Sequence, residues 1–294
     1  MEIRPAEPDD AEPAVAMHDQ LAPYLVMSAP SLRRRLEGPE KPGKGTFAAV
    51  DDGELVGWAS TALIAGSDPL GGQLRCLVRP DYRGQGIGTA LLELAHRSLK
   101  TAGAVSARVF ADPESADWAG RWGYEQTRQV HYAGIDPSQA PPLPPVPDGL
   151  RLAPLEELDP RALYEADQVA QRIKPGDATI TASPYEEWVA AVWQSPGMVL
   201  DLSVAALDGD RVVSFTLGNG DHHKIWSQMT ATMPEYQGAG LAKLVKCAAL
   251  GRAAEAGVVG AYTANYDGNE PMLAVNTWLG YRRIATHSVL ICPL

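Results

Sequence analysis

Two glycine-rich turns in the sequence have the residue types and spacing of an anion-binding backbone. They are Arg83-Gly84-Gln85-Gly86-Ile87-Gly88 and Gln237-Gly238-Ala239-Gly240-Leu241-Ala242, and they lie 154 residues apart. Because glycine has no Cβ, the N–H groups of such a turn can approach a phosphate group closely. Each turn follows an apolar segment with a proline and precedes a helical pattern, whose first N–H groups and positive dipole end would face the same anion. The sequence therefore predicts two phosphate-binding turns, each between a strand and a helix.

The elements that would position the two turns occur in the same order in both halves of the chain. An acidic, alanine-rich helical segment comes first, and a β-hairpin with an Asp-Gly type of turn follows, at residues 46–60 and at residues 204–217. After each glycine turn come an apolar helix face, a glycine, an apolar strand and a short helix that ends in Gly-Tyr. This order predicts an α/β fold, an α+β mixed sheet with helices packed around it, in duplicate.

A proline-rich segment separates the two halves. Residues 136–149 contain six prolines in fourteen residues and show no apolar periodicity, which predicts an extended, semi-rigid connector. A chain of 294 residues is long enough for two domains that each bury a core. We therefore expect an N-terminal domain at 1–135, a linker at 136–149 and a C-terminal domain at 150–294.

Composition and charge limit the kinds of partner. The residues are 45% hydrophobic and 21% charged, and the formal net charge is −11. No apolar run approaches the roughly 18 residues that cross a bilayer, and the N-terminus lacks the apolar region of a signal peptide. The acidic balance disfavours nucleic acid and weakly favours a cationic partner. We expect a cytoplasmic protein with no membrane or nucleic-acid partner.

The cysteines are few and widely separated. Cys76, Cys247 and Cys292 are odd in number, which is typical of a reducing compartment and excludes a disulfide framework or a Cys-rich zinc site. His222 and His223 are adjacent, but no third or fourth ligand stands at a metal-binding spacing. No metal is expected.

The turn pattern Gln/Arg-x-x-Gly-x-Gly/Ala, between a central strand and a long helix, resembles the acyl-CoA-binding motif of the GNAT superfamily of N-acetyltransferases. Both copies fit the motif without a gap. The early hairpins and the Gly-Tyr pairs, Gly123-Tyr124 and Gly280-Tyr281, extend the resemblance over nearly the whole chain. The resemblance implies two tandem GNAT-like acyl-CoA-binding domains that use acetyl-CoA as the donor substrate.

The resemblance also implies which residues would contact CoA. In this family the turn binds the CoA pyrophosphate, and the preceding strand separates from its neighbour so that pantetheine can pair with exposed backbone. Asn265 resembles a family asparagine that hydrogen-bonds the pantetheine arm, whereas its counterpart in the first half is Ala111. The second site therefore looks more complete. The implied CoA-binding residues are Val78, Arg83, Gly84, Gln85, Gly86, Ile87, Gly88, Thr89, Thr230, Ala231, Thr232, Gln237, Gly238, Ala239, Gly240, Leu241, Ala242, Lys243 and Asn265.

The catalytic groups are less well defined by the sequence. Acetyl transfer to an amine requires a neutral nucleophile and a proton for the departing thiolate. Family members often use a glutamate on the central strand and a tyrosine four residues before the final Gly-Tyr, but here the strands offer Gln73 and Gln228, and Ala119 and Asn276 stand at the tyrosine position. His223 could accept a proton, or could simply be exposed on a loop. Asn276 could hold substrate or CoA, or could pack or cap a helix.

The sequence as a whole predicts an acetyl-CoA-dependent N-acetyltransferase that acts on a primary amine of a small molecule. Direct transfer in a ternary complex is expected because neither half places a Cys or Ser in a recognisable nucleophile arrangement. The C-terminal half is the expected catalytic domain, with His223 and Asn276 as candidate catalytic residues. Two alternatives stay open: transfer of a longer acyl or aminoacyl group, and a catalytically inactive acyl-CoA sensor or scaffold.

Overall fold

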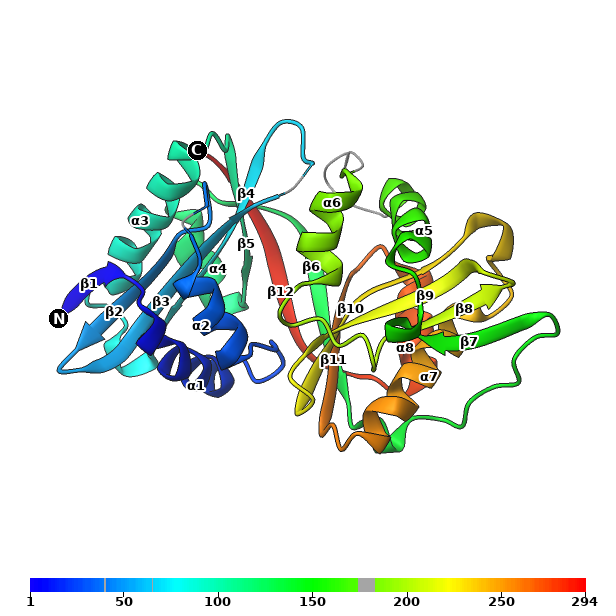
Figure 1. Ribbon diagram of the computed structural model, residues 1–294. Coiled ribbons are helices and arrows are strands. Elements are labelled where there is room, and N and C mark those ends of the chain that lie inside the picture. The colour runs from blue at the N-terminus through cyan, green and yellow to red at the C-terminus, as the bar shows by residue number, and fades with distance from the viewer. Residues whose placement is uncertain (40, 65, 174–182) are drawn as a thin grey trace. The chain divides into compact units, whose positions relative to one another are not determined.

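The computed structural model describes residues 1–39, 41–64, 66–173 and 183–294 (Figure 1). The chain forms two compact units. Unit 1 contains Met1–Val130 together with Thr286–Leu294, and unit 2 contains His131–Ala285. The domains expected at 1–135 and 150–294 stay a prediction; the two units place the expected linker, 136–149, in unit 2 and the C-terminal nine residues in unit 1.

Unit 1 is built on a mixed sheet. Its strand order is β1-β2-β3-β4-β5-β12-β6; β4 and β5 are parallel, and β1 to β4 pair antiparallel in sequence order. Only the first part of β6 and the last part of β12 (Arg282–Pro293) belong to this unit. The elements are β1 (Glu2–Pro5), α1 (Ala11–Leu21), α2 (Ala29–Glu37), β2 (Thr46–Asp51), β3 (Glu54–Leu63), β4 (Gly71–Val78), α3 (Ile87–Thr101), β5 (Ser106–Ala111), α4 (Pro113–Gly120) and β6 (Glu125–Ile135).

Different helices cover the two faces of the unit 1 sheet. Side chains alternate between the faces of a strand, so neighbouring residues of β2 pack against different helices. Ala48 lies in a cluster with residues of α1 and α2, whereas Ala49 lies in a cluster with Ile87 and Leu91 of α3. Figure 1 shows α3 and the pair α1 and α2 on opposite sides of these strands. The predicted apolar face of the helix after the first glycine turn therefore packs on the sheet.

Unit 2 repeats this plan. Its strand order is β6-β11-β10-β9-β8-β7; β10 and β11 are parallel, and the pairs β7–β8, β8–β9 and β9–β10 are antiparallel. The mixed α/β fold predicted from the sequence is confirmed. The elements are β7 (Leu150–Pro154), α5 (Pro160–Ile173), α6 (Tyr185–Trp188) with a following π-helical turn, β8 (Val204–Asp208), β9 (Arg211–Gly220), β10 (Lys224–Thr232), α7 (Leu241–Glu255), β11 (Gly260–Tyr266), α8 (Glu270–Leu279) and β12 (Arg282–Pro293).

The unit 2 sheet is also covered on both faces. Ala205 of β8 lies in a cluster with Leu163 of α5 and Trp188 of α6, whereas the next residue, Ala206, lies with Leu244 of α7. In Figure 1, α5 and α6 lie on one side of the unit 2 strands and α7 on the other. Both α3 and α7 end just before a glycine in the left-handed region, Gly103 and Gly257, as the sequence predicted.

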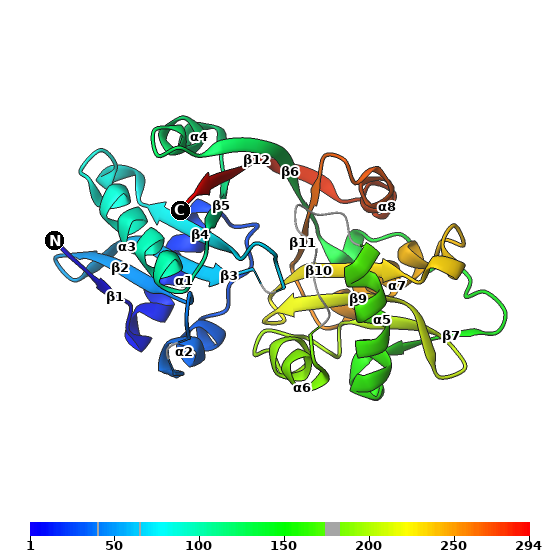
Figure 2. The ribbon, with the colours of Figure 1, turned by 90° about the horizontal axis from the view of Figure 1, so that it is seen from above.

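Strand β12 closes the unit 1 sheet. Its residues Ser288–Pro293 pair antiparallel with Ala111–Ser106 of β5. Figure 2 shows this end of β12, in red, beside β5. Leu290 and Cys292 are buried in the same cluster as Leu92 of α3. Part of the unit 1 core is therefore supplied by a segment that follows all of unit 2 in the sequence.

Candidate acyl-CoA site

Each glycine turn ends in a left-handed glycine that caps a helix. Gly86 has φ +84° and is the N-cap of α3, and Gly240 has φ +78° and is the N-cap of α7. An L-residue is strained in this region, which explains the glycines. Because the cap residue itself has no side chain, it leaves the first-turn N–H groups of the helix available to a ligand. The two turns are suited to hold a phosphate group at the positive end of a helix dipole.

The residue that opens each turn joins it to the preceding strand. Arg83 Nε donates to Val78 O at 3.3 Å, and Gln237 Nε2 donates to Thr232 O at 3.4 Å. Arg83 also forms an ion pair with Glu114, at 3.4 Å from Nη1 to Oε2. We interpret both side chains as supports that hold the turn at the end of its strand. This role was not apparent from the sequence.

The two parallel strands beside each turn are paired over only three residues. Gly71–Gln73 of β4 pair with Ser106–Arg108 of β5, and Lys224–Trp226 of β10 pair with Gly260–Tyr262 of β11. Among the described residues, no further pairs join these strands. Unpaired backbone groups at such a split can accept an extended ligand arm as an additional hydrogen-bonding partner. The predicted residues Thr230–Thr232 lie past the split and stay paired with β9 on their other side.

The split in unit 2 carries a β-bulge that its counterpart in unit 1 lacks. The register of β10 against β9 shifts between Ser227 and Met229, directly after the last pair with β11. The register of β4 against β3 continues without a shift. Thr263 Oγ1 donates to Ser227 O at 3.3 Å across the opening. A bulge redirects backbone groups next to a site, so the two splits differ in geometry.

Asn265 and Asn276 lie together at the unit 2 split. Asn276 Nδ2 donates to Asn265 Oδ1 at 2.6 Å, which joins the end of β11 to α8. Asn276 is buried, and its Oδ1 has no hydrogen-bond partner among the described residues. In unit 1 the counterpart Ala111 is buried against β12. The sequence-based difference between the halves therefore corresponds to a side-chain pair that only unit 2 contains.

Lys243 and His223 lie at different ends of unit 2. Lys243 is in the first turn of α7, and its Nζ lies 5.0 Å from the ring centre of Trp278 on α8. His223 is exposed and precedes β10, at the opposite end of that strand from the glycine turn. Because β10 and β11 are parallel and His223 lies level with Val259, Asn265 is about 20 Å further along at 3.3 Å per residue. The structure does not bring His223 and Asn276 together.

The most unusual titratable group of unit 2 was not singled out from the sequence. Lys246 of α7 is buried, and its Nζ donates to Ser227 Oγ at 2.7 Å, beside the bulge. Burial lowers the pKa of this lysine to about 7. The only sequence signal was a lysine between Val245 and Cys247, within an apolar stretch of the helix.

Each cysteine thiol is held in its protonated form. Burial raises the pKa of Cys76 to about 12, and burial also raises the pKa of Cys247 and of Cys292. Among the described residues, no group of three or more His, Cys, Asp and Glu side chains has the arrangement of a metal site. In the same part of the chain, no helix combines the length and the apolar character of a membrane span.

Comparisons with known proteins agree with this geometry. Residues 14–124 match the Acetyltransferase (GNAT) family. A mycothiol acetyltransferase of Nocardia farcinica is 29% identical over 283 residues, 92% of this chain and 90% of that protein. A mycothiol acetyltransferase of Nocardiopsis dassonvillei is 28% identical over 290 residues, 90% of this chain and 85% of that protein.

Solved structures show the same two-unit fold. A GCN5-related N-acetyltransferase from Sphaerobacter thermophilus has a TM-score of 0.76 at 19% identity, over 99% of this chain and 95% of that chain. A tandem GNAT protein from the clavulanic acid biosynthesis pathway has a TM-score of 0.73 at 18% identity, over 99% of this chain and 98% of that chain. Together with the two helix-capping turns and the strand splits, these similarities show that the chain has a tandem GNAT fold. The protein is an N-acetyltransferase, as the match of residues 14–124 and the acetyltransferase relatives indicate.

Proposed function

We propose that the enzyme transfers the acetyl group of acetyl-CoA directly to a primary amine of a small molecule, and that unit 2 catalyses the transfer. The observation that carries this proposal is the split between β10 and β11, with its bulge at Ser227 and the Asn265–Asn276 pair at its mouth. Unit 1 has a split without a bulge, and Ala111 in place of the asparagine. We assign it a weaker CoA site or a structural role.

Residues on both sides of the unit 2 split fit the parts of acetyl-CoA. The turn that ends at Gly240 and the first turn of α7 would hold the pyrophosphate through backbone N–H groups. The backbone groups of Thr230–Thr232 on the side away from β9 would pair with the pantetheine arm, and the Asn265 amide would hydrogen-bond it. Most of these contacts use the backbone, which is why the glycine spacing matters more than the neighbouring side chains.

Direct transfer within a ternary complex is favoured over a covalent acyl-enzyme. A cysteine nucleophile needs a thiolate, and burial raises the pKa of Cys76, Cys247 and Cys292. The acceptor amine would then attack the thioester itself. It must be neutral to do so, because a protonated amine has no free electron pair.

The acceptor is proposed to be a small, cationic amine. The net charge of −11 favours the approach of a cation by long-range attraction. Relatives that align with most of this chain are named mycothiol acetyltransferase, so a mycothiol-related amine is the first candidate.

Two measurements test this function. Calorimetry with acetyl-CoA should detect binding, and the stoichiometry shows whether one or both units bind. Release of free CoA thiol, followed over mycothiol-related amines, amino sugars, aminoglycosides and polyamines, should identify an amine that supports turnover. Absence of acetyl-CoA binding would contradict the proposal, and binding without thiol release for any amine would contradict its catalytic part.

A further inference from the structure

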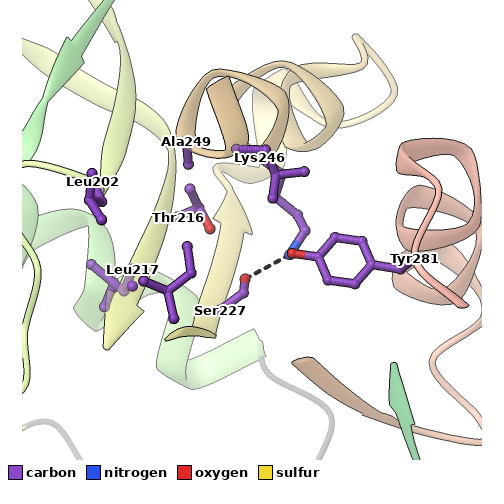
Figure 3. A pocket seen from close by; sticks show the side chains of 10 residues that line it. Leu202, Thr216, Leu217, Ser227, Lys246, Ala249 and Tyr281 are labelled. Carbon is purple, nitrogen blue, oxygen red and sulfur yellow. Dashed lines mark hydrogen bonds between the residues drawn. The ribbon is translucent and has the colours of Figure 1, made fainter. Parts of the chain in front are cut away.

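Lys246 occupies the interior of unit 2 on the sheet-facing side of α7. It is 3% exposed, and its side chain extends from the second turn of the helix towards β10 (Figure 3). The Nζ atom donates to Ser227 Oγ at 2.7 Å and lies 5.2 Å from the ring centre of Tyr281. Figure 3 shows the lysine amine between these two side chains. A buried lysine in such surroundings is rare and costs folding free energy unless it is neutral or paired.

The cavity beside Lys246 offers no counter-charge. It has a volume of about 20 Å³, room for about one water molecule. Its polar side chains are Ser227 of β10, Thr216 of β9 and Tyr281, which precedes β12; the remaining lining is apolar or glycine. Of the residues that the structure describes, no Asp, Glu, Arg or His lines it. With only hydroxyl groups facing it, the amine is destabilised in its charged form by burial alone, which lowers its pKa to about 7.

The fold does not require a lysine at this position. The two glycine turns are 154 residues apart, so the residue of α3 that corresponds to Lys246 is Leu92. Leu92 is 1% exposed and packs in the apolar core of unit 1. The tyrosines of the two Gly-Tyr pairs also differ. Tyr124 of unit 1 shares a hydrogen bond of 2.7 Å with His96, whereas Tyr281 of unit 2 lies against Lys246. An apolar side chain can therefore fill this place in a GNAT unit, and the lysine calls for another explanation.

The position of Lys246 relative to the strand split indicates that explanation. Its partner Ser227 is the first residue of β10 beyond the last pair with β11, Trp226–Tyr262, and is the residue at which the bulge begins. The split narrows to its closed end at this point. A pantetheine arm that entered from the glycine turn would reach this end with its sulfur, the atom at which the thioester is cleaved. The lysine amine is the titratable group that borders this end from α7.

We propose that Lys246 donates the proton that the CoA sulfur takes up as the acetyl group leaves. This inference rests on the proposed catalytic role of unit 2. The acceptor nitrogen bonds to the carbonyl carbon, the carbon–sulfur bond breaks, and its electron pair goes to sulfur. The sulfur then takes a proton from the Lys246 ammonium group, which becomes a neutral amine. The proton lost from the acceptor nitrogen goes to solvent, and Lys246 regains one from solvent after product release.

The direction of this transfer is favourable. A thiol has an ordinary pKa of about 8.5, so a thiolate accepts a proton from a lysine whose pKa is about 7. An exposed lysine, with an ordinary pKa of about 10.4, would hold its proton more strongly than the sulfur. Burial thus converts the side chain into a usable acid near neutral pH. Tyr281 is a poorer donor, because burial raises its pKa further above that of the thiol.

The test compares the wild-type protein with Lys246→Met, which fills the same space without an amine, and with Lys100→Met, an exposed lysine of unit 1. Acetyl-CoA and the most active amine of the screen are the substrates. Lys246→Met should lower kcat by about 100-fold or more while acetyl-CoA still binds by calorimetry. The wild-type kcat should fall as the pH rises through the pKa of Lys246, and this fall should be absent from Lys246→Met. Lys100→Met should behave as wild type.

Thermal unfolding separates chemistry from structure. Lys246→Met should unfold at an equal or higher temperature than wild type, because an apolar residue replaces a buried amine. A variant with unchanged kcat and an unchanged pH profile would overturn the assignment of Lys246 alone. Loss of acetyl-CoA binding and a lower unfolding temperature would show a structural role and would also overturn it. A wild-type protein that binds acetyl-CoA in neither unit would overturn the proposed function itself.

Discussion

Asn276 holds Asn265 through a single hydrogen bond of 2.6 Å, from Nδ2 of the first to Oδ1 of the second. The bond uses the acceptor of the Asn265 amide and thereby orients its NH₂ group, which remains as a donor at the strand split. Asn276 is itself fixed by burial in α8, where it is 4% exposed. A residue that the sequence suggested for catalysis is thus placed to position a residue that the resemblance assigned to CoA.

Substitution of either asparagine should weaken acetyl-CoA binding. Asn265→Ala removes one proposed hydrogen bond to acetyl-CoA. We therefore expect the KM for acetyl-CoA to rise about 5- to 10-fold with little change in kcat. Asn276→Ala should raise it less, because Asn265 stays in place but loses its orientation. Steady-state kinetics with varied acetyl-CoA measures both. Equal KM values in wild type and Asn265→Ala would contradict the assignment.

The two helix-capping glycines provide a matched pair for assigning the catalytic unit. Gly240→Glu should reduce thiol release by about 100-fold or more, because a carboxylate at the turn repels the pyrophosphate. Gly86→Glu introduces the same backbone strain, since both glycines have positive φ and open space where a Cβ would lie. Because unit 1 is not the proposed catalytic unit, Gly86→Glu should retain most of the wild-type rate of thiol release. Thermal unfolding checks that both variants fold. The opposite pattern of activities would move catalysis to unit 1.

The ionised side chain of Asp10 should stabilise unit 1 at neutral pH, and this stabilisation should be lost in acid. Burial opposes ionisation of this carboxyl, but hydrogen bonds from Arg4, at 2.7 and 3.0 Å, and from the Glu7 N–H outweigh it and lower the pKa below the usual value. The stabilisation is present above the ordinary pKa of about 3.9 and is lost as the pH falls through the lower folded-state pKa. Asp10→Asn should therefore cost about 1 kcal/mol at pH 7, and this cost should shrink as the pH falls through the lowered pKa of Asp10.

Denaturant unfolding over a pH series measures this difference. The control is Asp9→Asn, because the Asp9 side chain is 96% exposed and its ion pair with Arg33 lies at the surface. The control should change the free energy of unfolding by less than about 0.5 kcal/mol at every pH. A constant difference between wild type and Asp10→Asn from pH 7 to pH 2 would show that the hydrogen-bonded charge has no role.

Trp188 should stabilise unit 2 through its indole N–H as well as its ring. Trp188 Nε1 donates to Asp167 Oδ2 at 2.7 Å, and both residues are buried. Trp188→Phe keeps an aromatic ring but removes the donor from a buried carboxylate, so it should cost about 1–3 kcal/mol of unfolding free energy. Trp278→Phe, at a site 41% exposed, is the control and should cost less than about 0.5 kcal/mol. Similar costs for the two variants would contradict the role of the N–H.

The parts of the fold that depend on short stretches of chain were predictable. The hairpins follow from Asp-Gly turns between alternating residues, and the capping turns follow from the spacing of glycines, as at Gly86 and Gly240. The order of these elements then indicated the GNAT-like fold. Each of these features is encoded within about twenty consecutive residues, so local physical preferences are enough to find it.

The parts that depend on contacts between distant residues were not predictable. The pairing of Ser288 with Ala111 joins segments far apart in the sequence, and no local pattern specifies the partner of β12. Lys246 would be expected on an exposed face, but it lies on the side of α7 that packs against the sheet, so its amine is buried. The bulge at Ser227 likewise depends on how β9 and β10 align. No local sequence pattern specifies any of these three features.

The return of β12 to unit 1 has a consequence for synthesis of the protein. The residues from Thr286 onward are translated after the whole of unit 2, so β5 has an open edge throughout that time. The half that is made first is the half that is finished last. We expect a chain that stops at Ala285 to expose this edge and to aggregate on expression. An added peptide of residues 286–294 should pair with β5 and keep the truncated chain in solution. Quality control of the nascent chain would then act on unit 1, although its residues 1–130 were translated long before.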